Sequence, residues 1–366
     1  MKNIKKIIEK MKKTKNMDKQ AYFLHYPLPD FEFDTITLAH GSGGLLTHQL
    51  LEKAVFKILG NAWLDMRHDG AVVSAKGRMA FTTDSFVISP IFFPGGDIGE
   101  LAINGTINDV AMCGGLPEFL SLAFIIEEGF PVKDLWNIVI SIKYAIDKAG
   151  VKIVTGDTKV VDKGKGDKIF INTTGLGGMH PSADIRLSRI HKGDKIIVSN
   201  SIGTHGIAIL SVREGLQFET EIRSDTAPLH FMTRTLLDAF GTHIKLFRDP
   251  TRGGLAAVLN EIANATGYTL QLEEEKIPVL SQVRAACEIL GLDPLYSANE
   301  GVFVAIVSPQ IAEKAVETLH NFEEGRHAAV IGEITDKDQG IVLISNPLGG
   351  KRVMMMPVGE QLPRIC

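Results

Sequence analysis

The alternation of strand-like and helix-like segments along nearly the whole chain most strongly limits its fold. From Asp34 onward, short runs rich in β-branched and aromatic residues alternate with stretches whose apolar residues recur every three or four positions. In the stretch 97–112, one apolar helical face is predicted from Ile98, Leu101, Ala102 and Ile107. Strands that alternate with helices are typical of sheets covered by helices, so we expect mixed α/β, or α+β, domains.

Two such domains are expected, joined at the polar, proline-bearing segment MHPSADIRLSR. The first covers residues 34–180 and the second covers residues 190–350. In the first, expected strands are 34–40, 71–75, 78–86, 118–127, 151–161 and 168–179, and expected helices are 45–60, 97–112 and 132–150. The second begins with KIIVSNSIG, with helices near 204–214, 228–240, 253–266 and 279–290 and strands including 268–272, 301–307, 329–334 and 340–346.

Length and composition agree with this organisation. A chain of 366 residues with 45% hydrophobic residues is long and apolar enough for two cores. A net charge of -4 leaves no basic surplus to neutralise phosphates, so we expect no nucleic-acid partner. No apolar run approaches the length of a membrane span, so we expect no membrane partner. Three scattered cysteines favour a reducing, cytoplasmic location over a disulfide framework, and we expect Cys113 and Cys287 to be small core residues.

The two ends of the chain lie outside the expected domains. Residues 1–33 begin with a lysine-rich stretch that lacks the apolar core and cleavage site of a secretory signal, and we expect a poorly ordered extension. Residues 351–366 read as an extended, mobile tail that ends in Cys366, with Pro357 and Pro363 as stiff points. A thiol on the last residue of a chain is unusual, and either a frayed end or a chemical role explains it.

A glycine-rich loop, HGSGG at residues 40–44, is the first candidate binding element. It lies between an expected strand and an expected helix, where glycines let backbone N–H groups approach an anion. It lacks the Lys-Ser/Thr of a Walker A loop and the last glycine of GxGxxG. A tight turn that simply needs positive φ explains such a loop equally well. The candidate phosphate-binding residues are Gly41, Ser42, Gly43 and Gly44.

Several aspartates stand at expected strand ends or helix starts. Mg²⁺ bound to nucleotide phosphates takes a few carboxylates and keeps several waters, so carboxylates delivered from separate strands suit such a site. A single aspartate in this position is more often a turn former or a helix cap. The candidates are Asp69, Asp84, Asp109, Asp157 and Asp249.

Two further segments leave both a functional and a structural interpretation open. In RDPTRGGL, Arg248 and Arg252 flank Asp249, which fits either a phosphate-facing turn or a surface ion pair. Glu300, in YSANEGVFVAIV, precedes an apolar strand. A carboxylate there serves as a general base if burial tunes its pKa, although a solvated strand end is the commoner case.

Taken together, these stretches resemble the superfamily of ATP-dependent enzymes typified by aminoimidazole ribonucleotide synthetase. HGSGG, HDGAVV, TTDSF, NGTINDVAMCGG, GDTKVV and RDPTRGGLA occur in the family's order. Combined with the terminal PRIC, they resemble the carbamoyl dehydratases that make cyanide ligands for [NiFe] hydrogenases. The resemblance covers residues 34–366, and the lysine-rich residues 1–33 depart from it.

The resemblance implies a two-domain, aminoimidazole ribonucleotide synthetase-like fold and a reaction on the chain's own end. A HypF-like carbamoyltransferase places a carboxamide on Cys366, ATP drives its dehydration to a thiocyanate, and the cyano group passes to iron on a HypC–HypD-like scaffold complex. ATP and Mg²⁺ are the implied cofactors, and a homodimer joined through the N-terminal domains is the implied assembly.

The resemblance also implies roles for individual residues. Cys366, Glu300 and Lys159 are the implied catalytic residues, with Glu300 as the base and Lys159 holding developing negative charge. Asp69, Asp84 and Asp249 match the family's metal-binding aspartates, with Asp109 and Asp157 less secure. Asn108, Thr158 and Arg248 join the glycine loop as candidate ATP or phosphate ligands. The alternatives are a small-molecule kinase or synthetase of the same superfamily, and a non-catalytic carrier that uses Cys366 to bind iron or a partner.

Overall fold

The computed structural model describes residues 18–67, 69–215, 221–337, 339–358 and 364–365. These fall into two compact units. Unit 1 comprises residues 1–87, 97–110 and 117–178, and unit 2 comprises residues 88–96, 111–116 and 179–366. The short stretches 88–96 and 111–116 therefore belong with the second half of the chain, although they lie inside the domain expected at 34–180.

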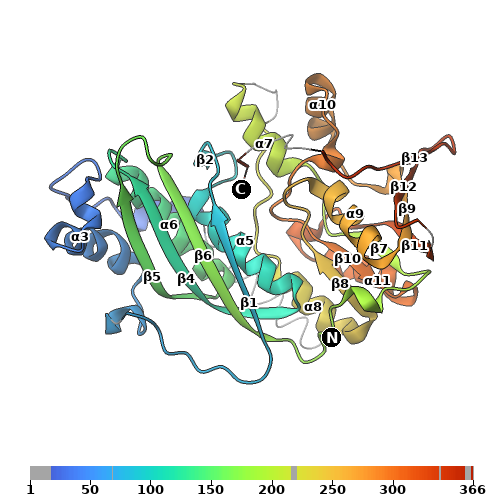
Figure 1. Cartoon of the computed structure of the whole chain (residues 1–366), viewed down its shortest axis with the longest axis horizontal. Coiled ribbons are helices and arrows are strands. Elements are labelled where there is room, and N and C mark those ends of the chain that lie inside the picture. The colour runs from blue at the N-terminus through green and yellow to red at the C-terminus, as the bar shows by residue number, and fades with distance from the viewer. Residues whose placement is uncertain (1–17, 68, 216–220, 338, 359–363, 366) are drawn as a thin grey trace. The chain divides into compact units, whose positions relative to one another are not determined.

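Unit 1 is built on a four-stranded sheet in the order β1-β6-β4-β5. The strands are β1 (Met79–Phe86), β4 (Gly115–Glu127), β5 (Lys152–Val161) and β6 (Ile169–Met179). β1 pairs antiparallel with β6, and β4 pairs parallel with β5. Helices α5 (Ile98–Met112) and α6 (Val132–Ala149) lie along this sheet (Figure 1). Alternate residues of β4 and β6 are buried, because one face of each strand packs beneath the helices.

The other face of this sheet carries exposed side chains. Phe81 on β1 is 70% exposed, and Ile125 on β4 is 42% exposed. Strand pairing puts Lys159 directly beside Ile125, so the charged residues of β5 share this open face. A sheet face with exposed aromatic and aliphatic side chains is apolar surface that a partner can cover.

The start of unit 1 corrects two strand predictions. Residues 34–40 form only an isolated bridge, Thr35 with Pro131, followed by the 3₁₀ helix η1 (Leu38–Gly41). The Ile36 backbone donates a hydrogen bond to Phe130 and accepts one from Gly129. This pairing is too short to form a strand. Residues 71–75 form no strand, because they pair with no neighbouring strand in the part of the chain that the structure describes. The remaining elements here are α3 (Leu45–Leu50), η2 (Leu51–Phe56), α4 (Lys57–Leu59) and η3 (Leu64–Met66). The two short strands β2 (Phe92–Phe93) and β3 (Gly96–Asp97) belong to the stretch 88–96 of unit 2 and its junction with unit 1.

The described part of the N-terminal extension is ordered, which corrects the expected poor order of residues 18–33. Helix α2 (Lys19–His25) begins at Asp18, whose side chain accepts a hydrogen bond from the Gln20 backbone. The Lys19 ammonium lies 2.5 Å from the buried Glu100 carboxylate and 3.2 Å from that of Asp97. Two buried carboxylates need a nearby cation, and the extension supplies it. Residues 1–17 lie outside the described residues.

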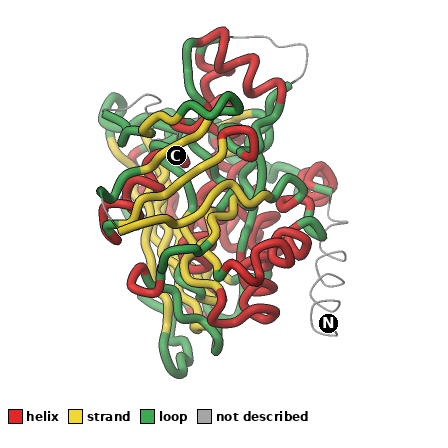
Figure 2. The backbone as a smooth tube through the Cα atoms, turned by 90° about the vertical axis from the view of Figure 1, so that its right-hand side faces the viewer, coloured by secondary structure: helices red, strands yellow, loops and turns green. Residues whose placement is uncertain are grey.

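Unit 2 is built on a seven-stranded sheet in the order β13-β12-β9-β11-β7-β10-β8. The strands are β7 (Lys195–Val198), β8 (Ile244–Arg248), β9 (Tyr268–Glu273), β10 (Val304–Val307), β11 (Ala329–Lys337), β12 (Val342–Ser345) and β13 (Lys351–Val353). The helices are α7 (Thr204–Arg213), α8 (His230–Phe240), α9 (Gly254–Thr266), α10 (Ser281–Leu290) and α11 (Ala312–Leu319). Figure 2 shows strands in yellow and helices in red. The four predicted helices of this half are all present, and the mixed α/β class is confirmed.

Short 3₁₀ helices fill the connections of unit 2. They are η4 (Leu187–Arg189), η5 (Gly241–His243), η6 (Glu274–Lys276), η7 (Pro294–Tyr296), η8 (Pro309–Ile311) and η9 (Glu323–Gly325). The main core packs α9 against the sheet through Leu255, Leu259 and Ile262. A smaller core joins α7 to α10 through Ile207, Val283 and Ala286. This second core holds the first half of α7 against α10.

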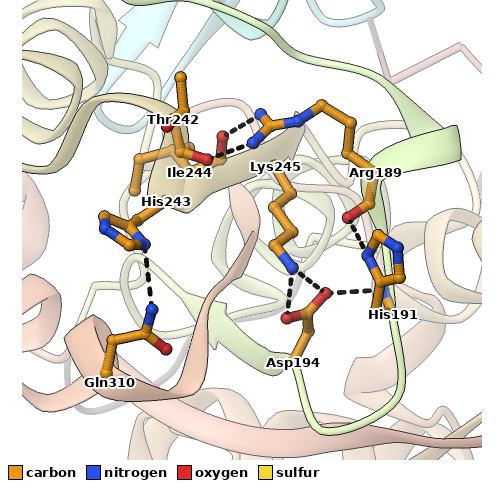
Figure 3. A network of polar contacts seen from close by, with 8 residues as sticks. All are labelled: Arg189, His191, Asp194, Thr242, His243, Ile244, Lys245 and Gln310. Carbon is orange, nitrogen blue, oxygen red and sulfur yellow. Dashed lines mark hydrogen bonds and ion pairs between the residues drawn. The ribbon is translucent and has the colours of Figure 1, made fainter.

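A buried ion pair fixes the entry to unit 2 (Figure 3). The Lys245 ammonium, on β8, lies 2.7 and 2.8 Å from the two carboxylate oxygens of Asp194, immediately before β7. Asp194 also accepts a hydrogen bond from the His191 backbone at 2.7 Å. Arg189 extends the network by donating to the backbone carbonyls of Thr242 and Ile244. The interdomain connection is thus tied to β8 by charge and by main-chain hydrogen bonds.

The tail and one cysteine depart from expectation. β13 lies within residues 351–366, Met354 is buried, and the Asn260 amide donates to the Met354 carbonyl at 3.0 Å. The start of the segment expected to be mobile is therefore part of the sheet. Cys287 is buried as expected, whereas Cys113, the residue after the end of α5, is exposed. Among the described residues, no helix is both long and apolar enough to cross a membrane.

We expect Asp194→Asn to lower the free energy of unfolding by about 3 kcal/mol, because it leaves the Lys245 ammonium buried without a counter-charge. The measurement is the midpoint of urea unfolding. Asp336→Asn is the matched control, since it breaks the exposed pair with Lys192 and should leave the midpoint nearly unchanged. Equal shifts in the two variants would contradict the role given to burial.

Candidate functional site

The glycine loop of unit 1 is pressed against β5. A Cβ atom at Gly41 would lie 2.6 Å from the backbone nitrogen of Val160, so a side chain there must displace the loop. Gly43 has a φ of 79°, in the left-handed region that favours glycine. Gly44 is the N-cap residue of α3. The loop is therefore a tight turn and also a stretch of backbone that opens a helix.

A cavity of about 250 Å³ lies beside this loop and is lined by residues of α3, η2, α4, β4 and β5. Its lining includes Gly41 and Gly43 together with Asp157, Thr158 and Lys159. The rest of the lining is mainly apolar and comprises Thr47, Leu51, Val55, Phe56, Leu59, Leu64, Leu122, Phe124, Ile153, Thr155 and Gly156. An apolar cavity with a few convergent polar groups is the usual form of a small-molecule site. The structure thus brings together five of the residues singled out from the sequence.

Two of these residues form a salt bridge with each other. The Lys159 ammonium lies 2.6 Å from each carboxylate oxygen of Asp157, and the Thr158 backbone donates to Asp157 at 2.8 Å. The hydrogen bond from Lys159 holds the pKa of Asp157 below its ordinary value. Both side chains are exposed, so this pair is weakly held. Lys159 can therefore exchange its carboxylate partner for an anionic ligand at little cost.

The candidate metal ligands are dispersed in a single chain. Asp84 on β1 accepts a hydrogen bond from the Ser85 backbone, and Asp109 on α5 accepts one from the Thr82 hydroxyl at 2.8 Å. The sheet order places β1 and β5 at opposite edges, about 14 Å apart for three strand spacings, so Asp84 and Asp157 are separated.

Two further carboxylates do not complete a metal group. Asp69 is exposed, and Asp249 belongs to unit 2. No group of three or more His, Cys, Asp or Glu side chains is placed to hold a metal within the described residues. The metal-ligand assignment therefore stays a prediction.

Two other candidate phosphate ligands, Asn108 and Arg248, are engaged in contacts of the fold itself. Asn108 is buried within α5. Arg248, at the end of β8, forms an exposed ion pair with Glu261 on α9. The surface ion-pair interpretation therefore describes Arg248 in this structure, and its phosphate role stays a prediction.

In unit 2, Glu300 is buried and joined to a segment that the sequence did not single out. Its backbone N–H donates to the Asp225 carboxylate at 3.1 Å. A Cβ atom at the following residue, Gly301, would lie 1.7 Å from the Asp225 carbonyl oxygen, so only glycine permits this approach. Burial raises the pKa of Asp225 to about 6. A carboxylate of shifted pKa therefore lies beside the candidate base.

The last described residues of the tail lie in the same unit. Ile365 is 4% exposed, and its carbonyl oxygen lies 2.6 Å from Nε2 of His205 on α7. His205 Nδ1 lies 2.7 Å from the hydroxyl of Ser224, the residue before Asp225. A chain of contacts thus links the tail to the segment that contacts Glu300. Cys366 itself lies outside the described residues.

Sequence reasoning missed His205, Ser224 and Asp225. His205 reads as an isolated histidine at the start of an apolar helix, and Ser224-Asp225 reads as a polar turn before a proline. The only available signal was the pair of glycines around the histidine, in GTHG, since Gly203 adopts φ of 83° as the N-cap of α7. Contacts between positions 160 residues apart follow from the tertiary fold and have no local sequence pattern.

We expect the stability of the wild type, measured relative to the Asp225→Asn variant, to fall as the pH rises. The folded-state pKa of about 6 exceeds the ordinary value of 3.8, so the folded protein retains a proton that the unfolded chain loses. The stability contributed by Asp225 is therefore fully present below pH 3.8 and lost as pH rises through 6. Urea midpoints of wild type and Asp225→Asn between pH 4 and 7 measure this difference, and a constant gap would contradict it.

Comparison with known proteins identifies the family. The AIR synthase related protein family matches in two parts, its N-terminal domain at residues 67–179 and its C-terminal domain at residues 191–345. The chain is 50% identical over 338 residues to the carbamoyl dehydratase HypE of Azotobacter vinelandii, covering 92% of this chain and 99% of the relative.

Two solved structures agree with this match. The hydrogenase maturation protein HypE in complex with ATP superposes with a TM-score of 0.88 at 44% identity, over 91% of this chain and all of the other. A chain of a HypE–HypF complex superposes with a TM-score of 0.75 at 46% identity, over 84% of this chain and 99% of the other. The two-domain architecture expected from the sequence is confirmed.

Proposed function

The chain belongs to the family of the carbamoyl dehydratase HypE, within the AIR synthase-related proteins, and on that premise we propose how its own residues perform the family's reaction. It is an ATP-using carbamoyl dehydratase of hydrogenase maturation. The 50% identity across nearly the full length of both chains carries this conclusion. The assignments to individual residues below are our proposals.

The reaction converts a carboxamide on the thiol of Cys366 into a thiocyanate. An amide oxygen is a poor leaving group, so ATP first phosphorylates it. The C–O bond then breaks, the oxygen departs with phosphate, and the amide nitrogen loses both protons as the C≡N bond forms. The sum is loss of one water from the tail and hydrolysis of ATP to ADP and phosphate. The cyano group supplies a cyanide ligand for [NiFe] hydrogenase iron.

The unit 1 cavity is our proposed nucleotide site. Its apolar walls suit an adenine ring, and the glycine loop presents backbone N–H groups at the start of the helical stretch 45–59. Lys159 lies beside that cavity and holds developing negative charge on the transferred phosphate after releasing Asp157. The tight fit of Gly41 on Val160 keeps the loop in place without a ligand.

Glu300 is our proposed base for the amide protons. It is buried in the same unit that holds Ile365, and its main chain contacts Asp225, beside the Ser224–His205 link to the tail. Glu300 is 4% exposed, so its carboxylate is largely shielded from bulk water. Cys366 is the acceptor because it is the residue directly after this anchored end.

Mg²⁺ is proposed to accompany ATP, where it would neutralise phosphate charge. The residues fit this role in part, since Mg²⁺ is commonly held by one or two carboxylates plus phosphates. Asp157 qualifies because it lines the cavity and stays ionised, as its lowered pKa indicates. Asp84 and Asp109 lie toward the other edge of the sheet, so they meet Asp157 only if a second copy of the chain contributes them.

The open sheet face of unit 1 supports the proposed homodimer. Exposed Phe81 and Ile125 give it an apolar centre, and a second copy placed on it buries both. A HypF-like carbamoyltransferase is the proposed donor of the carboxamide, because a close relative forms a complex with HypF. A HypC–HypD-like scaffold is the proposed acceptor of the cyano group, and the cytoplasm is the proposed location.

We expect Gly41→Ala to weaken ATP binding by about tenfold or more, roughly 1.4 kcal/mol, because the new methyl group meets the Val160 backbone and displaces the loop. Titration calorimetry with Mg-ATP measures the affinity. Gly178→Ala, outside the loop and the cavity, is the matched control, since a Cβ there meets the Glu118 carboxylate at 3.8 Å, and its affinity should match wild type. Equal affinities in the two variants would place ATP elsewhere.

We expect the intact mass of the protein to rise by one carboxamide on incubation with the carbamoyltransferase and carbamoyl phosphate, and to fall by one water after Mg-ATP. Cys366→Ala should accept no carboxamide. Glu300→Gln should accept it and keep it after ATP, because loading does not need the base. An adduct that ATP leaves unchanged in the wild type would make the chain a carrier, and no adduct at all would favour a small-molecule kinase or synthetase.

A further inference from the structure

Two backbone carbonyls immediately before the terminal cysteine are held by three donors from distant parts of unit 2. The Ser89 backbone N–H donates to the Arg364 carbonyl at 3.2 Å. The Arg213 guanidinium, at the end of α7, donates to the same carbonyl and also to the carbonyl of Ser89. His205, at the start of α7, meets the carbonyl of Ile365. We call Ser89, His205 and Arg213 the tail clamp.

The clamp is supported by buried groups around it. His205 is fully buried, and the Phe93 ring meets it edge-on at 5.7 Å. A Cβ atom at Gly95 would lie 2.7 Å from the Ser224 backbone nitrogen, so the 88–96 segment and Ser224 are in close contact. The Ser224 backbone donates to the Pro94 carbonyl at 2.8 Å. The clamp is therefore a packed site rather than a chance surface contact.

The hydrogen bonds define the state of His205. The Ile365 carbonyl can only accept, so His205 carries its proton on Nε2. Nδ1 then accepts from the Ser224 hydroxyl, whose oxygen in turn accepts from the Thr226 backbone at 3.1 Å. Burial, with a smaller contribution from the Arg213 charge, lowers the pKa of His205 to about 4. A neutral imidazole therefore binds the tail carbonyl throughout the neutral range.

The tail adopts a backbone conformation that needs outside support. Arg364 has a φ of 54°, in the left-handed region, where a residue with a side chain pays about 1 kcal/mol or more. Both donors to its carbonyl lie in the clamp, and the buried Ile365 side chain anchors the next residue. The bend at Arg364 is thus stabilised by contacts that a free chain end lacks.

From these contacts we infer that His205 and Arg213 are positioning residues that dock the tail for the dehydration step. They hold the Arg364 and Ile365 carbonyls, and His205 also contacts Ser224, which precedes the Asp225 that contacts Glu300. Docking of these two residues would limit how far the next residue, Cys366, can move from that segment. This inference rests on the proposed function for its chemistry. Reacting groups gain rate when they are held close together, and the clamp supplies that constraint.

The first test measures docking without the reaction. The full-length protein is treated with iodoacetamide, and the alkylation rate of Cys366 is followed by mass spectrometry of its C-terminal peptide. We expect His205→Ala and Arg213→Ala each to raise that rate by about threefold or more, because loss of local order exposes a thiol. Arg223→Ala is the matched control, since within the described part of the chain the Arg223 side chain pairs with exposed Glu221, and its rate should equal wild type.

The alkylation of Cys287 in the same samples reports folding, because this thiol of α10 is buried in the small core that α10 forms with α7. Unchanged Cys366 rates in both clamp variants, with Cys287 still protected, would overturn the inference. If Cys287 becomes reactive in His205→Ala, that variant is misfolded, and Arg213→Ala and Ile365→Gly are used in its place because neither changes a buried residue of α7. A Cys366 alkylation rate equal to wild type in both would overturn the inference.

The second test separates positioning from general stability. In a single turnover of carbamoylated protein with Mg-ATP, His205→Ala and Arg213→Ala should slow dehydration by about tenfold or more. Loading by the carbamoyltransferase should stay near the wild-type rate. His205→Gln should restore part of the dehydration rate, because its amide N–H can donate to the Ile365 carbonyl.

Parallel loss of loading and dehydration would mean a structural role only and would overturn the inference. Dehydration at the wild-type rate in both clamp variants would overturn it as well. Failure of the wild type to lose water with ATP would instead contradict the proposed function, while the alkylation test would still decide whether the clamp docks the tail.

Discussion

The close approach of Gly301 to Asp225 is the constraint on which the unit 2 site depends. Any side chain at position 301 collides with the Asp225 carbonyl oxygen at 1.7 Å. Because that approach is possible, the Asp225 carboxylate reaches the Glu300 backbone, and Ser224 reaches His205. The absence of a side chain at Gly301 thus allows three segments to be joined by hydrogen bonds. They are the residues before β10, the turn at Ser224–Asp225 and the end of the chain at Ile365.

Within the described residues of unit 1, helices cover one face of the sheet and leave exposed side chains on the other. The helical face packs α5 and α6 densely, and it allows Gly41 to seat the glycine loop against β5. The open face carries Phe81, Ile125 and Lys159, a combination that suits contact with a second chain and with anions. The four-stranded order also explains why one chain separates its candidate metal ligands, since the carboxylates lie on both edges.

Periodicity and motif order predicted much of this molecule, and they failed where long-range contacts decide. The helices of the second half were found because their apolar stripes repeat locally. The stretch 71–75, AVVSA, looks like a strand because of its two valines, but among the described residues no neighbouring strand pairs with it. The extension was misread because Lys19 finds its partners, Asp97 and Glu100, about eighty residues away. His205 was missed for the same reason, since its role depends on a contact with Ile365, 160 residues away.

The tail is held by main-chain carbonyls and one apolar side chain, and it is joined to the sheet at Met354. As a ligand on a short tether, it faces its own binding site at an effective concentration on the order of millimolar. The contacts at the clamp can therefore be individually weak and still keep the tail docked most of the time. Weak contacts also break quickly, and rapid release would suit the proposed transfer of the cyano group to another protein.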